Sequence, residues 1–330
     1  MKQINFVMRE MTSVRYYIPL VIEASKRGIK CNFLVGKCGK YNSPHLYKDV
    51  LEEYAKEYNF SIEDTSNIKN VEGVLFFVEC TGLELLEPND KQIKIILTYS
   101  GDFIEQNKIY KDKANHICMI SKYFVDFYDL NSEKNLFFGT PKFDVELSAN
   151  KVLEKYSLNK DSKKALVIYP RTRDLGRIDL RDIYDSLIKH NFEILVKTRG
   201  KDPVRKDFYK GDHYFEDTCW FPHTTIELMK VSDVVINFGS GAIKECAMMG
   251  VPVIDFYIKP FRKLFAPLYE YDYARNYTGE FNIEDFGESL EYLTNNDFSN
   301  EFNKARKECL YDKDYNSSKN LIDFIEKEYL

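Results

Sequence analysis

Short apolar runs that alternate with segments of helical spacing limit most strongly how this chain can fold. In the first half the apolar runs lie at residues 4–8, 29–36, 74–79, 93–100, 116–121 and 135–139. Residues 13–28 form the clearest helix between them, with Gly28 at a position that commonly follows a helix end. This alternation is typical of βαβ units and predicts a mostly parallel sheet.

The same alternation restarts after a polar, lysine-rich segment at residues 148–164. Later apolar runs lie at residues 165–169, 192–197, 213–216, 234–238 and 252–257, and charged helical segments follow from about Asn282. A chain of 330 residues also exceeds one ordinary domain of roughly 100–200 residues. We therefore predict two α/β domains, over residues 1–147 and 165–314, joined by a linker over 148–164. A last helix at residues 315–330 is predicted to pack back on the first domain.

Charge and cysteine content narrow the function classes. A formal net charge of -5 argues against a general nucleic-acid binder, because such proteins need a basic face to neutralise phosphates. The 7 cysteines are scattered without C-x-x-C pairs, which indicates neither a disulfide framework nor a zinc site and fits a reducing cytosol. No apolar run approaches the ~18 residues of a membrane span. We expect a cytoplasmic protein, and contact with the inner face of the membrane stays open.

Charged and small residues gather where the predicted strands of the second half end. Doubly wound sheets bind ligands outside the carboxyl ends of their strands, so these residues are candidates for a binding site. They are Arg171, Arg173, Lys197, Arg199, Asn237, Gly239, Ser240 and Gly241. Four cations at one edge of an acidic protein predict an anionic ligand. For each single residue, solvated charge at a strand end is the alternative.

The turn Gly239–Ser240–Gly241 joins a predicted strand to a helix. The first N–H groups of a helix have no internal partner and favour an anion, and glycine lets that anion approach closely. Glu245 lies one turn later on the same helix face, where its carboxylate would accept hydrogen bonds from ribose hydroxyls. Alternatively, Ser240 caps the helix, the glycines only form the turn, and Glu245 is an exposed helix residue.

Residues 221–256, FPHTTIELMKVSDVVINFGSGAIKECAMMGVPVIDF, resemble the nucleotide-binding half of GT-B-fold enzymes. The resemblance is to the group that contains CDP-glycerol glycerophosphotransferase-like transferases and non-hydrolysing UDP-GlcNAc 2-epimerases. In that group the corresponding turn, glutamate and following strand hold the nucleotide diphosphate and ribose. Thr224 and Glu227 have the spacing of a capping box that opens a helix. His223, at the same helix start, is a candidate contact to the base or diphosphate, as is Thr224.

Other segments carry the same resemblance. NLFFGTPKFD at residues 135–144 looks like the G-x-P-x-x-D signature that ends the first domain of these transferases. ILVKTRGK at residues 194–201 looks like their strand that usually ends in lysine–x–histidine, with Arg199 where the histidine is often found. TYSGD at residues 98–102 replaces the histidine–glycine pair of their first half. The resemblance implies a GT-B-like α/β architecture, with two Rossmann-like domains whose parallel sheets face a central cleft.

The resemblance also implies a mechanism without metal or another cofactor, because a helix N-terminus and basic side chains take up the charge on the departing diphosphate. Arg171, Arg173 and Lys197 are the candidates for that role. An inverting transfer needs a base on the opposing domain. Asp102, beside Gly101, is slightly preferred over Glu79 and Glu10, and a structural role is the alternative for each. DKD at residues 312–314 has the spacing of a metal motif, but we interpret it as solvated charge.

Three functions follow, in order of preference. The first is a transferase that moves a sugar or polyol phosphate from a nucleotide-sugar or CDP-polyol donor to a glycan or lipid-linked acceptor in surface polysaccharide synthesis. The second is a nucleotide-sugar epimerase, which would convert its donor without an acceptor. The third is a catalytically inactive nucleotide-binding or scaffold protein. No G-x-G-x-x-G, G-x-S-x-G or P-loop motif points to another class.

Overall fold

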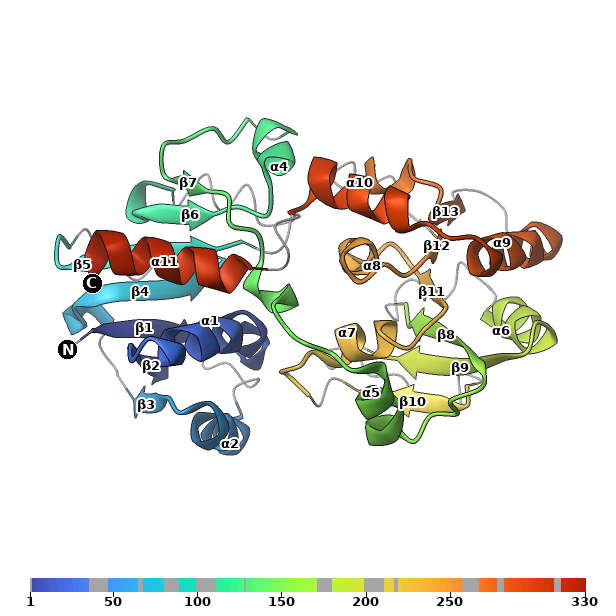
Figure 1. Cartoon of the computed structure of the whole chain (residues 1–330), viewed down its shortest axis with the longest axis horizontal. Coiled ribbons are helices and arrows are strands. Elements are labelled where there is room, and N and C mark those ends of the chain that lie inside the picture. Colours follow the sequence, from blue (N-terminus) through green and yellow to red (C-terminus); the bar gives the residue numbers. More distant parts are fainter. Residues whose placement is uncertain are drawn as a thin grey trace. The chain divides into compact units, whose positions relative to one another are not determined.

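The computed structural model of the chain divides into two compact units, each built on one parallel sheet (Figure 1). Unit 1 comprises Met1–Val145 and Leu310–Leu330, and unit 2 comprises Glu146–Cys309. The structure describes residues 2–35, 47–64, 68–79, 89–98, 111–127, 129–170, 180–198, 211–216, 219–256, 267–277, 282–311 and 316–330.

Unit 1 holds a 7-stranded sheet in the order β3-β2-β1-β4-β5-β6-β7. The strands are β1 (Gln3–Met8), β2 (Lys30–Val35), β3 (Ser61–Asp64), β4 (Gly73–Val78), β5 (Gln92–Leu97), β6 (His116–Cys118) and β7 (Asn135–Leu136). The helices are α1 (Val14–Lys26), α2 (Lys48–Tyr58), α4 (Lys122–Phe127) and α11 (Ser317–Tyr329), with short 3-10 turns η1 (Met11–Ser13), η2 (Ile68–Asn70), η5 (Lys111–Lys113) and η6 (Pro141–Phe143). The chain winds outward from β1 to one edge and from β4 to the other, so the winding reverses between β1 and β4.

Unit 2 repeats this arrangement in a 6-stranded sheet with the order β10-β9-β8-β11-β12-β13. The strands are β8 (Lys163–Ile168), β9 (Phe192–Lys197), β10 (His213–Phe215), β11 (Val234–Asn237), β12 (Val253–Phe256) and β13 (Ala274–Tyr277). The helices are α5 (Ala149–Tyr156), α6 (Leu180–Lys189), α7 (Thr224–Met229), α8 (Ala242–Met249), α9 (Ile283–Asn295) and α10 (Ser299–Cys309). Here the winding reverses between β8 and β11.

The central strands form because their apolar runs are buried on both faces, as is usual in parallel sheets with helices on each side. In β1 every residue after Gln3 is buried. The ring of Phe6 lies 4.9 Å from that of Tyr17 in α1 and 5.2 Å from that of Phe33 in β2, centroid to centroid. Tyr17 also donates a hydrogen bond from its hydroxyl to the carbonyl of Val7 at 3.0 Å, which ties α1 to the sheet.

Every apolar run of the sequence pattern contains a strand, but the pattern missed β3 and β13. Residues 148–164, predicted as a linker, contain helix α5 and the first residues of β8, and both belong to unit 2. Glu227, which is buried in α7, accepts hydrogen bonds from Lys155 Nζ at 2.8 Å and from Tyr156 Oη at 2.6 Å and so binds α5.

The capping box predicted from Thr224 and Glu227 is wrong. Helix α7 begins one residue earlier than that motif requires, with His223 at the N-cap position. Glu227 is therefore one position too far along the helix to close the box, and its carboxylate faces α5 instead.

The segment Gly139–Asp144 holds the start of the C-terminal helix within unit 1. Asp144 accepts hydrogen bonds from the backbone N–H groups of Ser317, at 3.3 Å, and Ser318. Gly139 has a φ of +79°, and a Cβ there would lie 2.3 Å from the ring of Tyr311. Along its length, α11 packs beside α1 (Figure 1). Arg27, which follows α1, forms ion pairs with Asp323 and Glu326 of α11.

Asp144 should give the stability of the protein a measurable pH dependence. Burial raises the pKa of Asp144 from 3.8 to about 6, although the hydrogen bonds from Ser318 and Ser317 oppose this. Because the folded pKa exceeds the unfolded one, the stabilising contribution of Asp144 is full below pH 3.8 and is lost as the pH rises through about 6. Asp144→Asn should remove this decline, which urea unfolding at a series of pH values measures.

Asp323→Asn is the matched control. Hydrogen bonds from Lys319 and Arg27 lower the pKa of Asp323, so its contribution is present above pH 3.8 and is lost on acidification, with the opposite sign. Parallel unfolding curves for wild type and Asp144→Asn between pH 4 and 7 would contradict the assignment.

Candidate functional site

In each unit, the strand ends beside the winding reversal carry polar residues. Open α/β sheets bind ligands at this point, outside the carboxyl ends of the strands. In unit 2 the reversal lies between β8 and β11, and β11 ends at Asn237, two residues before Gly239 of the glycine turn. In unit 1 it lies between β1 and β4, which are followed by Arg9 and Glu10 and by Glu79.

A buried carboxylate holds the glycine turn of unit 2 in place. Asp255 in β12 is 0% exposed. Its carboxylate accepts hydrogen bonds from Gly239 N at 2.7 Å, Asn237 Nδ2 at 2.6 Å and Tyr269 Oη at 2.6 Å. Gly239 has a φ of +60°, a conformation that favours glycine. Sequence reasoning missed Asp255, although an aspartate inside an apolar run signals a buried acceptor with fixed donors.

The side chains of Asn237 and Ser240 complete the turn. Asn237 Nδ2 also donates to the Ser240 carbonyl at 3.0 Å, and Ser240 Oγ donates to Asn237 Oδ1. Ser240 Oγ accepts a hydrogen bond from Ala242 N at 3.2 Å, but the N-cap position of α8 is Gly241 and not Ser240. Within the described residues, no acceptor is recorded for the backbone amides of Ser240 and Gly241. These amides, at the start of α8, are therefore what the turn offers to an anion.

The remaining predicted binding residues of unit 2 lie at neighbouring element ends. Lys197 is the last residue of β9, is buried, and donates from Nζ to the Thr198 carbonyl at 2.6 Å. His223 is buried at the start of α7, and Thr224 Oγ1 donates to the Cys219 carbonyl at 3.3 Å. Glu245 is half-buried in the first turn of α8. Their contacts to nucleotide stay predictions, and Arg171, Arg173 and Arg199 lie outside the described residues.

Two of the three predicted catalytic carboxylates lie in the described part of unit 1. Glu79 is 3% exposed and directly follows β4. Its φ is +54°, a left-handed conformation that costs a residue with a Cβ about 1–2 kcal/mol. Glu10 is half-buried, and its carbonyl accepts a hydrogen bond from Ser13 N at 3.1 Å. The strain and burial of Glu79, beside the reversal, favour it over Glu10. Asp102 lies outside the described residues.

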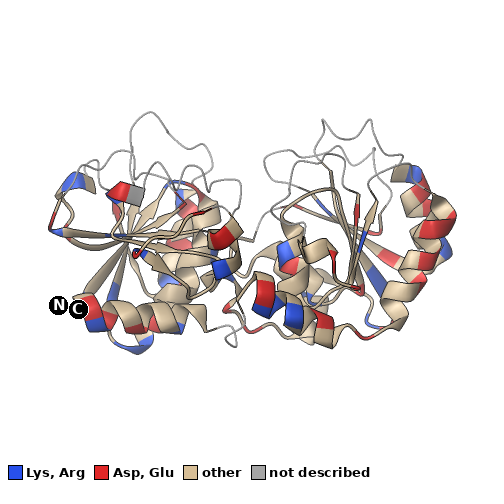
Figure 2. Cartoon of the chain, turned by 90° about the horizontal axis from the view of Figure 1, so that it is seen from above, with Lys and Arg blue, Asp and Glu red and all other residues tan. Residues whose placement is uncertain are grey.

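Other features of the described chain bear on ligands less directly. No group of three His, Cys, Asp or Glu residues in its described ranges could hold a metal ion, and DKD at residues 312–314 lies outside them. None of the helices described is long and apolar enough to cross a membrane. Figure 2 shows Lys and Arg interspersed with Asp and Glu along the helices of both units.

Comparisons with solved structures identify the fold. UDP-GlcNAc 2-epimerase from Neisseria meningitidis, bound to UDP-GlcNAc, matches with a TM-score of 0.63 and 12% identity over 99% of this chain and 100% of that chain. The wall teichoic acid polymerase TagF matches with a TM-score of 0.65 and 12% identity over 99% and 88%. The glycotransferase of kitacinnamycin matches with a TM-score of 0.62 and 9% identity over 99% and 98%.

The chain has a GT-B-type fold. The resemblance to GT-B enzymes that the sequence indicated is therefore confirmed at the level of fold. No model of a known protein family matches the sequence, and no curated protein matches it.

Asp255 should contribute strongly to stability through the turn that it holds. Asp255→Asn replaces one of the two carboxylate oxygens with an NH2 group. Either Gly239 N, or Asn237 Nδ2 together with Tyr269 Oη, then loses its acceptor. We expect a loss of about 1.5–3 kcal/mol in the free energy of unfolding, as for hydrogen bonds to charged groups. Tyr269→Phe, which removes one donor and leaves the other two in place, should cost less than Asp255→Asn. Urea unfolding measures both, and equal stability of Asp255→Asn and wild type would refute the role.

Proposed function

We propose that this protein is a GT-B-type enzyme that acts on a nucleotide-activated donor. It transfers a sugar or polyol phosphate to a glycan or lipid-linked acceptor, in surface polysaccharide synthesis at the cytoplasmic side of the membrane. The observation that carries the proposal is the turn between β11 and α8, which presents amides at the winding reversal of unit 2. The fold supports it, since one solved structure of this fold holds UDP-GlcNAc and a TagF structure carries CDPG.

Unit 2 binds the nucleotide in this proposal. The amides of Ser240 and Gly241 and the N-terminal end of α8 receive the diphosphate, because aligned peptide dipoles favour negative charge there. Glu245, half-buried one turn later, accepts hydrogen bonds from the ribose hydroxyls. The predicted cations are Lys197, Arg171, Arg173 and Arg199, with His223 and Thr224 as further contacts. The four cations neutralise the departing phosphate without a metal, so a chelator should leave activity unchanged.

Unit 1 supplies the base. The base removes the proton of the acceptor hydroxyl while the acceptor oxygen forms its bond to the transferred group and the bond to the departing nucleotide breaks. Glu79 is the first of the two described candidates and Glu10 is the second, while Asp102, outside the described residues, is the third candidate. A carboxylate that is removed from water is a better base than an exposed one, because desolvation disfavours its charged form.

Epimerisation is the second candidate, favoured by the match that spans the whole Neisseria epimerase. The two reactions differ in a direct assay. An epimerase converts the donor with no acceptor present, whereas a transferase releases nucleotide only when an acceptor is added. A protein that binds nucleotide but does neither is the inactive alternative.

Nucleotide binding is the first test. A thermal-shift screen of nucleoside diphosphates should reveal at least one ligand, because binding to the folded state raises apparent stability. Glu245→Gln should then lower the affinity for the ribonucleotide that binds best by about tenfold to a hundredfold. The reason is the loss of a hydrogen bond to a charged group, which is worth roughly 1.5–3 kcal/mol. The 2′,3′-dideoxy form, which lacks the ribose hydroxyls, should lose much less affinity.

Glu288→Gln is the matched control, since Glu288 is exposed on α9 and has no assigned contact to nucleotide. Isothermal titration of wild type and both variants measures the affinities. If Glu245→Gln binds the ribonucleotide as tightly as Glu288→Gln, Glu245 is only a helix residue. If no nucleotide binds to wild type, the proposed function fails as a whole.

A further inference from the structure

A chain of hydrogen bonds connects helix α5 to the start of helix α7 in unit 2. The carboxylate of Glu227 accepts from Lys155 Nζ at 2.9 and 2.8 Å, once to each oxygen, and from Tyr156 Oη at 2.6 Å. The backbone of Glu227 closes the first turn of α7, because Glu227 N donates to the His223 carbonyl at 3.1 Å. Glu227 thus links two residues of α5 directly to His223, which is one of the predicted contacts to nucleotide.

Further contacts hold the segment that leads into α7. Lys155 Nζ lies 3.6 Å from the sulfur of Cys219, and Thr224 Oγ1 donates to the Cys219 carbonyl at 3.3 Å. Within α7, a hydrogen bond of 3.3 Å joins Thr225 Oγ1 and His223 Nε2. The start of α7 is therefore bound to α5, to the preceding segment and within its own first turn.

The contacts of Glu227 are suited to fixing a position. The side chain of Glu227 is 5% exposed, whereas that of Lys155 is 41% exposed. Burial raises the pKa of Tyr156, and its hydrogen bond to Glu227 raises it further, so the phenol stays a neutral donor. Removing a carboxylate from water offsets much of its attraction to a lysine, so such a pair adds little net stability. Its directional hydrogen bonds nevertheless define one position for α7 against α5.

The start of α7 lies at the edge of the sheet where ligands are expected. Helix α7 follows β10 and precedes β11 in a parallel sheet, so it begins at the carboxyl edge and runs back to the amino edge. Groups that bind a ligand must be held within about 0.5 Å of their productive geometry. A shift of the helix start would move His223 with it.

We propose that Glu227 is a positioning residue for nucleotide binding, which holds the start of α7, and with it His223, in place to contact the nucleotide. This inference rests on the proposed function, because it requires that unit 2 binds a nucleotide. Glu227 acts through His223, and its own carboxylate is bound to α5. Lys155 and Tyr156, which bind that carboxylate, belong to the same device.

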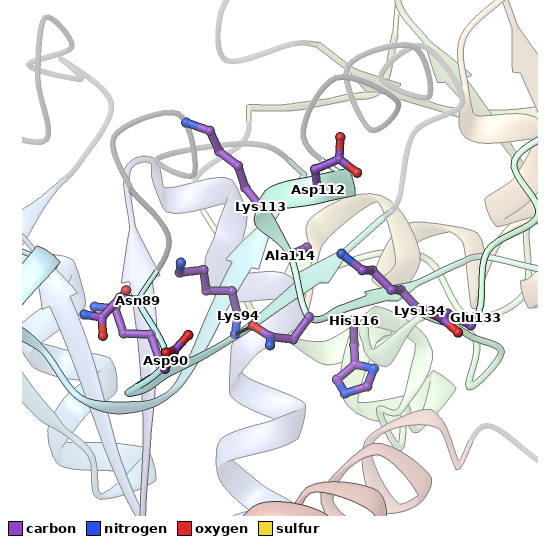
Figure 3. Close-up of a pocket in the computed structure, with 11 residues that line it drawn as sticks. Asn89, Asp90, Lys94, Asp112, Lys113, Ala114, His116, Glu133 and Lys134 are labelled. Atoms are coloured by element: carbon purple, nitrogen blue, oxygen red, sulfur yellow. Dashed lines mark hydrogen bonds between the residues drawn. The ribbon is translucent and has the colours of Figure 1, made fainter.

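Polar networks at the amino-terminal edges of the two sheets provide a contrast. In unit 1, lysines and carboxylates line a cavity of about 600 Å³ where β5 and β6 begin (Figure 3). In unit 2, the carboxylate of Glu193 accepts from Ser162 Oγ and lies 2.8 Å from His213 Nε2. Both networks lie at the edge away from the predicted nucleotide contacts. Glu193, whose side chain is 10% exposed, is therefore the matched control for Glu227.

Glu227→Gln is the main variant, since it keeps the shape of the side chain but removes the charge and one acceptor oxygen. UDP, CDP, GDP and ADP are the probes, titrated calorimetrically. The nucleotide that binds wild type best should bind Glu227→Gln about threefold to thirtyfold more weakly, in the range of couplings between contacting residues. Glu193→Gln should keep the wild-type affinity. Tyr156→Phe and Lys155→Met, which each remove one donor to Glu227, provide the same test if Glu227→Gln does not fold.

A second substitution separates positioning from a general loosening of the fold. If Glu227 acts through His223, Glu227→Gln should weaken binding much less in a His223→Ala protein than in wild type, because residues that act together have non-additive effects. A loss of the same size in both backgrounds would show that Glu227 acts elsewhere and would overturn the positioning role.

Trp220, the single tryptophan of the chain, reports on the same segment without a ligand. It is 9% exposed and lies in the segment that leads into α7. Glu227→Gln should move its fluorescence emission to longer wavelength, because a looser segment admits water to the indole. Glu193→Gln should leave the emission unchanged. The same emission in wild type and folded Glu227→Gln would contradict the link from α5 to this segment.

The titrations also separate this inference from the proposed function. If wild type binds a nucleotide and the folded variants of Glu227, Tyr156 and Lys155 bind it equally well, the positioning role fails and the proposed function stands. If Glu193→Gln weakens binding as much as Glu227→Gln does, loss of stability explains the effect and the positioning role is wrong. If none of the four nucleotides binds to wild type, the proposed function fails and the positioning role fails with it.

Discussion

The reversal of winding within each parallel sheet is the constraint on which both candidate sites depend. Neighbouring strands β8 and β11, and likewise β1 and β4, send their connections in opposite directions along the sheet, so their carboxyl ends stand next to each other with space beyond them. Residues that are distant in sequence come to the same edge of the sheet, such as Lys197 at the end of β9 and the turn at Gly239 after β11, with β8 between the two strands. The order of the strands in the sheet thus determines where a binding site can form, whichever side chains lie there.

At the reversal of unit 2, a buried carboxylate lies behind the turn that is proposed to bind an anion, and it disfavours that anion. Asp255 fixes the turn through three donors, but a negative charge beneath a phosphate site also repels the phosphate. The amides of α8 must therefore act together with cations. This gives a physical reason for the basic residues that the sequence places after β8 and β9, and it makes Lys197, buried at the end of β9, the described residue best placed to contribute.

The central strands could be predicted because burial on both faces demands unbroken apolar runs, as in VLFFV at residues 74–78. The edge strands SIED (Ser61–Asp64) and ARNY (Ala274–Tyr277) were missed because edge strands need little apolar surface. Asp255 was missed because its donors come from a turn 16 residues earlier in the chain and from Tyr269. The positive φ of Glu79 carries no sequence signal, since glutamate seldom adopts it.

The transferase and epimerase hypotheses differ in the role that they require of unit 1, since fold alone does not select a reaction. In either hypothesis the nucleotide is held in the same way, and unit 2 is the part proposed to hold it. They differ in the proton that must be moved: an acceptor hydroxyl proton for transfer, or a proton of the donor sugar for epimerisation. Glu79 is buried and strained beside the reversal of unit 1, which suits a base held in a fixed place. If Glu79 is the base, the group whose proton it removes decides between the two reactions.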